Sequence, residues 1–74
     1  MSNKICKPKD ADGNRFWIGD RMVMDCPDSD MHGEPVTITS VIYGIGRIGV
    51  AGIYDKGGSF ANYSPENFRR LDNE

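Results

Sequence analysis

The side chains of this sequence that could do chemistry are two cysteines, one histidine and a nearby pair of aspartates. They are Cys6, Cys26, His32, Asp28 and Asp30. Thiolate, imidazole and carboxylate groups are the usual ligands of zinc, but these five match no standard zinc motif, because no two of them form a Cys-x-x-Cys pair. A cysteine–histidine nucleophile would need the imidazole beside a thiol in a pocket, whereas His32 falls in a polar, turn-rich stretch. We therefore predict neither a metal site nor a catalytic group. The sequence leaves open whether the two thiols are free, paired or metal-bound.

Two further stretches spell ligand-binding motifs but lack the flanking elements that those motifs need. Residues 28–33 begin like a calcium loop, yet the twelfth position, which should carry a bidentate carboxylate, is Thr39. Residues 44–49, Gly-Ile-Gly-Arg-Ile-Gly, spell a dinucleotide fingerprint, which needs a helix directly after it to hold the pyrophosphate. Strand-like residues follow instead. We interpret the two stretches as a polar loop and a glycine-rich β-turn, and we expect no cofactor.

The aromatic side chains are candidates for binding. Tryptophan and tyrosine anchor many protein interfaces, and small β-barrels often present a shallow aromatic groove. A chain this short also needs part of its aromatic supply for its core, so packing is the alternative interpretation. The candidate protein-binding residues are Trp17, Tyr43, Tyr54 and Tyr63.

Three arginines offer a second kind of surface. Arg47, Arg69 and Arg70 could contact phosphates while aromatic rings stack on bases, as in proteins that bind single-stranded nucleic acid. Scattered solubilising charge is the simpler interpretation. The net charge of −2 also argues against generic nucleic-acid binding, which is typical of basic domains.

Length and composition limit the class of protein. Seventy-four residues make one domain, and a chain of this size buries only about 60% of its unfolded surface. The sequence contains no run of ten apolar residues, and polar residues follow Met1. We therefore expect no membrane span and no standard signal peptide, which makes the cytoplasm the expected location.

The elements that must position these residues are short β-strands. Residues 1–14 are polar and are predicted to form a flexible N-terminal arm, and residues 15–72 to form the folded domain. A first strand is expected over 17–25, with Met22 and Met24 on one face. A loop follows over 26–35, and then a strand over 36–43 that is rich in β-branched residues.

The second half of the chain continues this pattern. A strand is expected over 48–54, where Gly49 and Gly52 indicate a bulge, and a hairpin turn over 55–58 leads to a strand over 59–63. Residues 64–67, Ser-Pro-Glu-Asn, predict a single 3-10 or α-helical turn, because serine caps a helix and proline suits its first position. A very short last strand should follow.

The order of these elements resembles the SH3-like small barrels. The residues that carry the resemblance are Trp-Ile-Gly-Asp-Arg-Met-Val at 17–23, the strand over 36–43, the turn over 55–58 and Tyr-Ser-Pro-Glu-Asn-Phe-Arg-Arg-Leu at 63–71. The resemblance covers residues 16–71. It implies an all-β, SH3-like small barrel of four to five short antiparallel strands with one late helical turn, and it is shared by short bacterial and phage proteins of unknown function.

A more distant layout similarity links the chain to the type II plasmid dihydrofolate reductases. Residues 16–21 resemble their strand opening, and Gly58, Ser59 and Tyr63 resemble the flanks of their active-site strand. The glutamine and isoleucine that contact ligand in that family align with Ala61 and Asn62. That departure removes the ligand contacts, so the resemblance does not carry the reductase activity.

The sequence favours a small non-catalytic binding module, and a protein–protein interaction or adaptor protein of bacterial or phage origin is the first hypothesis. A nucleic-acid-binding small barrel is the alternative, and its affinity should fall steeply with rising salt. An oligomeric ligand-binding or reductase-like protein is the second alternative, which requires a symmetric pore. A protein partner is expected, and a homodimer stays open because short edge strands favour self-association.

Overall fold

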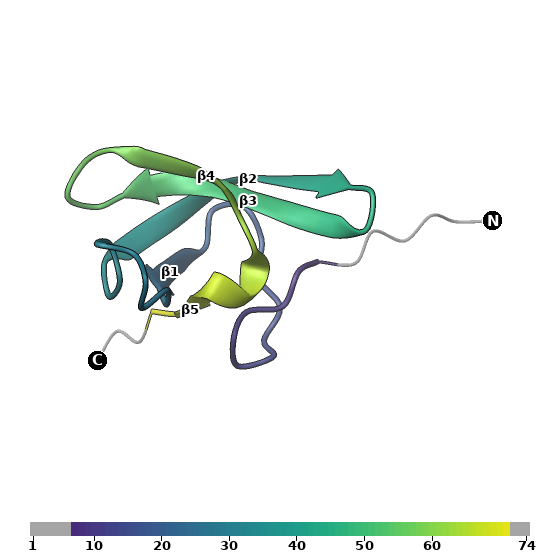
Figure 1. Cartoon of the computed structure of the whole chain (residues 1–74), viewed down its shortest axis with the longest axis horizontal. Helices are drawn as coiled ribbons and strands as arrows, with labels where there is room; N and C mark the ends of the chain where they lie inside the picture. The colour runs from purple at the N-terminus through teal and green to yellow at the C-terminus, as the bar shows by residue number, and fades with distance from the viewer. Residues whose placement is uncertain (1–6, 72–74) are drawn as a thin grey trace.

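The computed structural model describes residues 7–71, which form one five-stranded antiparallel sheet with the strand order β4-β3-β2-β1-β5 (Figure 1). The elements are β1 (Arg21–Met24), β2 (Pro35–Gly44), β3 (Arg47–Tyr54), β4 (Ser59–Tyr63), the 3-10 helix η1 (Pro65–Asn67) and β5 (Phe68–Arg70). The predicted all-β class, with its short antiparallel strands and one late helical turn, is confirmed. Residues 7–71 contain no helix that is long and apolar enough to cross a membrane.

The first strand is shorter than predicted, because the residues before it form a tight turn. The Asp20 N–H donates to the Trp17 carbonyl oxygen at 3.1 Å, and the Asp20 carboxylate accepts from the Trp17 N–H at 2.8 Å. Gly19 has a φ of 99°, which suits the third position of such a turn, and its N–H donates to the Ile38 carbonyl oxygen at 2.8 Å. The turn therefore holds Trp17 ahead of the β1 ladder and alongside β2.

The core follows the alternation of the strands. Met22 and Met24 are both buried, as their shared face predicts, while Val23 between them is partly exposed. The buried hydrophobic residues come from all five strands and from the segment before β1. They are Phe16, Met22, Met24, Val36, Ile38, Val50, Tyr54, Phe60 and Phe68.

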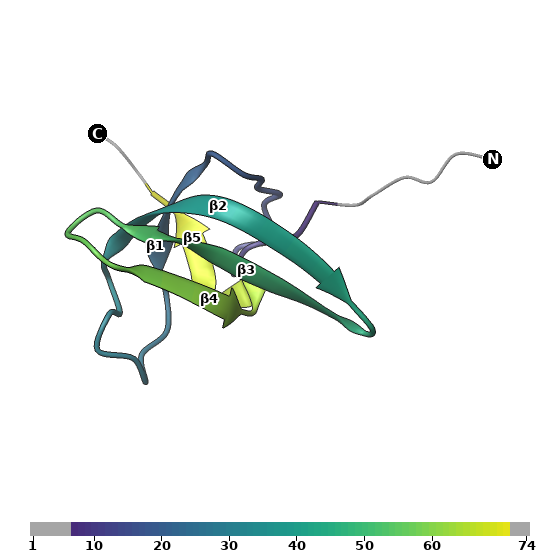
Figure 2. The ribbon, with the colours of Figure 1, turned by 90° about the horizontal axis from the view of Figure 1, so that it is seen from above.

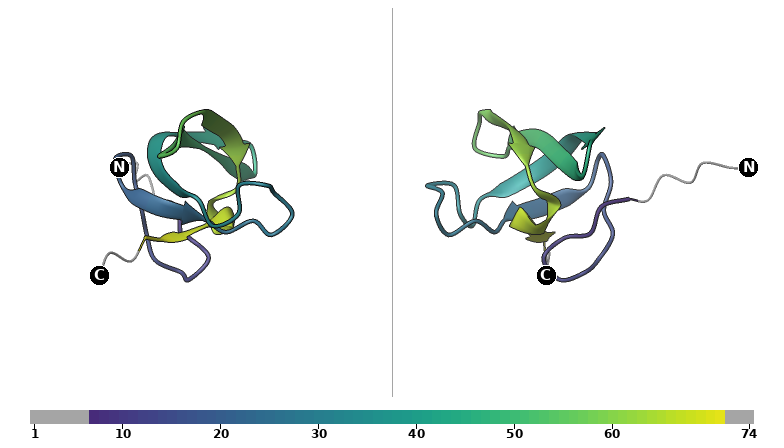
Figure 3. Two further views of the ribbon diagram at one scale, coloured as in Figure 1. Left: turned by 90° about the vertical axis from the view of Figure 1, so that its left-hand side faces the viewer. Right: turned by 45° about the vertical axis from the view of Figure 1, so that its right-hand side comes forward.

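The sheet curls until its two edge strands approach each other. The β2–β3 and β3–β4 ladders each shift register once, the second between Val50 and Gly52, and such bulges sharpen the bend of a strand (Figure 2). The ribbon views in Figure 3 show this curl from two further directions. Although β4 and β5 stand at opposite ends of the strand order, the ring centroids of Phe60 and Phe68 lie 5.3 Å apart. No ladder joins β4 to β5 within residues 7–71, so the sheet is not closed.

Gly52 is the glycine on which this curl depends. A Cβ atom at this position would lie 2.8 Å from Phe60 Cζ and closer still to the Thr37 carbonyl oxygen. Real Cβ atoms do not approach other atoms so closely, so only glycine lets the Phe60 ring cross β3 and enter the core.

The segment before β1 lies against β5. The Ala11 N–H donates to the Phe68 carbonyl oxygen at 2.8 Å, and a β-bridge joins Lys9 to Arg15. Asp10 is only 5% exposed, and its Oδ1 accepts from the backbone N–H groups of residues 12 and 14, both at 2.9 Å. Residues 7–14 of the predicted arm are therefore held to the sheet, while residues 1–6 of that arm lie outside the described residues.

Candidate functional site

The four aromatic residues predicted to bind a partner separate into two pairs. The ring centroids of Trp17 and Tyr43 lie 6.4 Å apart, and Tyr43 is 42% exposed. Tyr54 and Tyr63 instead pack on Phe60, with ring centroids at 5.2 and 5.5 Å. Tyr54 is buried, Trp17 and Tyr63 are partly exposed, and Tyr43 is the most exposed of the four.

Tyr54 belongs to the core. Its burial raises the pKa of its hydroxyl above 10.0, and the neighbouring Tyr63, which also shares a side-chain hydrogen bond with it, raises this pKa further. Because its pKa is raised, this hydroxyl stays protonated and is suited to packing and internal hydrogen bonding. Its contribution is to stability.

Large apolar side chains are exposed at the end of the β2–β3 hairpin, the end that also carries Tyr43. Ile42 is 58% exposed, and Ile45, in the two-residue turn between the strands, is 102% exposed. This end of the hairpin projects beyond the rest of the sheet (Figure 1). We call Trp17, Ile42, Tyr43, Ile45 and Arg47 the hairpin-tip surface.

The hairpin-tip surface carries a single charge. Arg47 is the only charged residue from Pro35 to Tyr54. Among the described residues, no carboxylate forms an ion pair with Arg47. The surface is therefore apolar with one available cation, which is the chemistry of many interface centres, where aromatic residues and arginine are enriched.

The sequence contained a signal for this surface that its periodicity did not reveal. Ile45 stands between Gly44 and Gly46 in a turn of two residues, and a side chain at such a tip has no layer of the fold above it. A β-branched apolar residue there, in place of the usual Asn, Asp or Gly, marks a position that packing does not explain.

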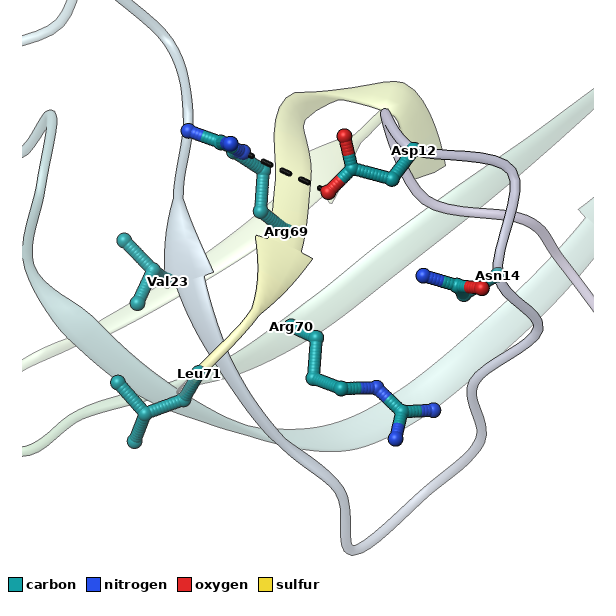
Figure 4. Close-up of a pocket in the computed structure, with 6 residues that line it drawn as sticks. All are labelled: Asp12, Asn14, Val23, Arg69, Arg70 and Leu71. Atoms are coloured by element: carbon teal, nitrogen blue, oxygen red, sulfur yellow. Dashed lines mark ion pairs between the residues drawn. The ribbon is translucent and has the colours of Figure 1, made fainter. Parts of the chain in front are cut away.

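The three predicted phosphate-contacting arginines do not form one face. Arg69 and Arg70 both line a cavity of about 410 Å³ beside Asp12, on the side of the sheet edge formed by β5 (Figure 4). Arg69 forms ion pairs with two carboxylates: its Nε lies 3.7 Å from Asp12 Oδ2 and 4.0 Å from Asp25 Oδ2. Arg47 lines other cavities, between β3 and η1.

The polar loop between β1 and β2 is organised by its histidine. The Cys26 N–H donates to His32 Nδ1 at 3.0 Å, and Asp25 Oδ1 lies 4.0 Å from the same nitrogen. The imidazole thus contacts the backbone of Cys26, which makes it a loop-bracing group. No group of three or more His, Cys, Asp or Glu side chains in residues 7–71 is placed to hold a metal ion. The predicted alternatives that involve Cys6 lie outside the described residues.

Comparison with known proteins found no similar protein. No family model, curated protein or solved structure matches the chain. The surfaces described above therefore carry the functional interpretation.

Proposed function

We propose that this chain is a small, non-catalytic protein-interaction module that binds its partner through the hairpin-tip surface. The observation that carries the proposal is the position of Ile42 and Ile45, which are exposed outside the core at the end of the hairpin that also carries Tyr43. Exposing such side chains without a partner gains nothing from the hydrophobic effect. Several large apolar side chains exposed at one end of a small protein support an interaction surface there.

The charge of the surface narrows the class of partner. Arg47 offers a guanidinium group that makes no ion pair within the described residues, and the rest of the hairpin is uncharged. A partner segment that combines apolar side chains with a carboxylate would satisfy both features, because complementary charge fixes register and improves specificity. We therefore take the partner to be an acidic, apolar segment of another protein.

The same proposal includes the finer fold. The strand order β4-β3-β2-β1-β5 and the contact between Phe60 and Phe68 across the two edge strands support an SH3-like small barrel. Such barrels bind short segments in shallow grooves beside their loops, and the projecting β2–β3 hairpin would be one wall of that groove. Kinship with short bacterial or phage proteins belongs to this proposal as well.

The nucleic-acid alternative receives less support from the geometry. Arg69 lies near two aspartates, and Arg47 lies away from the cavity that Arg69 and Arg70 share. A continuous basic groove beside stacking rings is what single-strand binding uses. The structure instead offers the rings of Trp17 and Tyr43 and a single arginine, Arg47, at the end of the hairpin that carries Tyr43.

The proposal is tested with a random peptide library displayed on phage. The library is selected on the wild-type chain after depletion on a variant with Ile42→Asp and Ile45→Asp, which removes the apolar surface without touching the core. Enriched peptides should combine apolar and acidic residues. Synthetic copies should change the fluorescence of Trp17, the only tryptophan.

The single substitution Ile45→Asp should lower the affinity for such a peptide by about tenfold or more, because a fully exposed anchor is lost and a charge that repels the acidic peptide is gained. The free energy of unfolding should hardly change, since Ile45 is outside the core. Arg70→Ala, a substitution on the edge strand β5, is the control and should bind like wild type. Peptides that bind the double variant equally well would contradict the proposal.

A further inference from the structure

A second site lies beside the hairpin, in a cavity between the start of β3 and the end of β4. The cavity has a volume of about 310 Å³ and is lined by Arg47, Ile48, Gly49, Asn62 and Ser64. None of these residues is acidic. Small-molecule sites begin at about this volume, so the cavity can hold the anionic head of a ligand with the remainder in solvent.

Three of the lining side chains can donate hydrogen bonds and are not engaged elsewhere within residues 7–71. Arg47 makes no ion pair there. The Ser64 side chain, although at the N-cap of η1, makes no capping hydrogen bond. Within the same residues, the Asn62 amide also has no hydrogen-bond partner. Guanidinium, amide and hydroxyl groups together form a donor set suited to an oxyanion.

The backbone at Asn62 singles out this position. Asn62 has a φ of 63° and is the only residue other than glycine with a positive φ in the described part of the chain. Its Oδ1 would lie 3.7 Å from a Cβ atom on Gly49, so the amide lies along the glycine backbone of β3. Glycine would adopt the conformation of residue 62 without strain. What asparagine adds at this position is its side chain, which faces the cavity.

We propose that this cavity binds the phosphate group of a small phosphate monoester. Arg47 would bind two phosphate oxygens through its planar fork, and Asn62 and Ser64 would donate to the others. The oxygens of a tetrahedral phosphate point in different directions, so they can accept hydrogen bonds from three donors placed around one cavity. The site is distinct from the hairpin-tip surface, although both use Arg47.

One acidic residue limits the site. Glu66 lines the adjoining cavity of about 510 Å³, which Arg47, Ile48 and Ser64 also line. Its carboxylate makes no ion pair with Arg47 within the described residues, but its negative charge near the site repels an anionic ligand. Glu66→Gln should therefore strengthen phosphate binding, by about threefold to tenfold for a neighbouring charge that is partly screened by solvent.

The test is a titration of isotope-labelled protein, followed by the backbone amide signals in NMR spectra. The probes are inorganic phosphate, glycerol 3-phosphate and adenosine 5′-monophosphate, each against sodium chloride at the same ionic strength. The amides of residues 47–49, 62 and 64 should shift and saturate. An ester that binds more tightly than inorganic phosphate identifies the class of group attached, and equal binding by all three assigns recognition to the phosphate alone.

The decisive variants remove single donors. Asn62→Gly keeps the backbone conformation and deletes the amide, and Ser64→Ala deletes the hydroxyl. Each should weaken binding by about tenfold, the loss expected for one hydrogen bond to a charged group. Arg70→Ala is the matched arginine control and should bind phosphate like wild type.

Two results would overturn the proposal. One is a set of small, non-saturating shifts spread over the molecule, and the other is unchanged phosphate binding by Asn62→Gly and Ser64→Ala. The outcome is separable from that of the peptide experiment. Ile45→Ser, which adds no charge near Arg47, should weaken peptide binding and leave phosphate binding intact, and Asn62→Gly should leave peptide binding intact.

Discussion

At the scale of single residues, the aromatic side chains show how one residue type serves two purposes. The sequence identified Trp17, Tyr43, Tyr54 and Tyr63 as one set, because composition alone does not say which rings face inward. The fold decides through register. Tyr54 and Tyr63 fall where β3 and β4 close over Phe60, and Tyr43 falls near the end of β2, where it meets Trp17.

The inward position of Tyr54 predicts a late ionisation. Because burial raises its pKa in the folded state above 10.0, its stabilising contribution is complete below pH 10 and is lost as the pH rises through the folded pKa. The tyrosinate absorbance of wild type minus that of Tyr54→Phe should have its midpoint above pH 10, at pH values where circular dichroism shows the native sheet. A midpoint at or below pH 10 would contradict the burial of this hydroxyl.

At the scale of elements, the sequence predicted the strands well and their ends less well. Ser59–Tyr63 was predicted with its observed bounds, and the strands at 36–43 and 48–54 each extend by one residue at one or both ends. Alternation and β-branched composition carry that information locally. The shortening of the first strand depends on hydrogen bonds between the 17–20 turn and β2, which pair residues distant in sequence.

The curl of the sheet predicts an asymmetry between two glycines. Gly52→Ala should lower the free energy of unfolding by about 3 kcal/mol, because the new methyl group would overlap Phe60 and the backbone of β2. In a domain with about 5 kcal/mol of total stability this is a large loss. Gly44→Ala is the control, since its nearest atom would lie at an ordinary 3.7 Å. Urea unfolding that ranks the two variants equally would be inconsistent with the tight crossing at Gly52.

At the scale of the whole molecule, the domain includes more of the N-terminal segment than its polar composition indicates. The sequence suggested a boundary after residue 14, because charged and turn-forming residues are typical of arms. Asp10 instead folds this stretch on itself and onto β5. Sequence alone could not reveal this contact, because it joins residue 11 to residue 68.

The attachment of this segment is tested at Asp10. Asp10→Ala removes the acceptor for two backbone N–H groups and should cost about 2 kcal/mol of stability. Asp10→Asn keeps one acceptor oxygen and should cost less. Thermal unfolding followed by circular dichroism compares the two, and equal stability of wild type and Asp10→Ala would show that the segment adds nothing to the fold.

The candidate sites were predictable in part. Arg47 was identified from sequence as an arginine in a glycine-rich turn that could contact phosphate, and Trp17 and Tyr43 because their types suit interfaces. Asn62 and Ser64 were not identified, since their meeting with Arg47 requires the register of β3 and β4 and the position of η1. Local sequence can predict that a residue lies in a turn, whereas the meeting of side chains from different strands depends on the assembled sheet.

The proposed interaction surface is tested most directly by amide chemical-shift mapping of the best peptide from the phage selection on the wild-type chain. The proposal predicts that the largest shifts fall on Trp17 and on residues 42–47, with little change in the loop over 25–34. Shifts centred on β5, around Arg69 and Arg70, would contradict it and would place the binding surface at that edge strand.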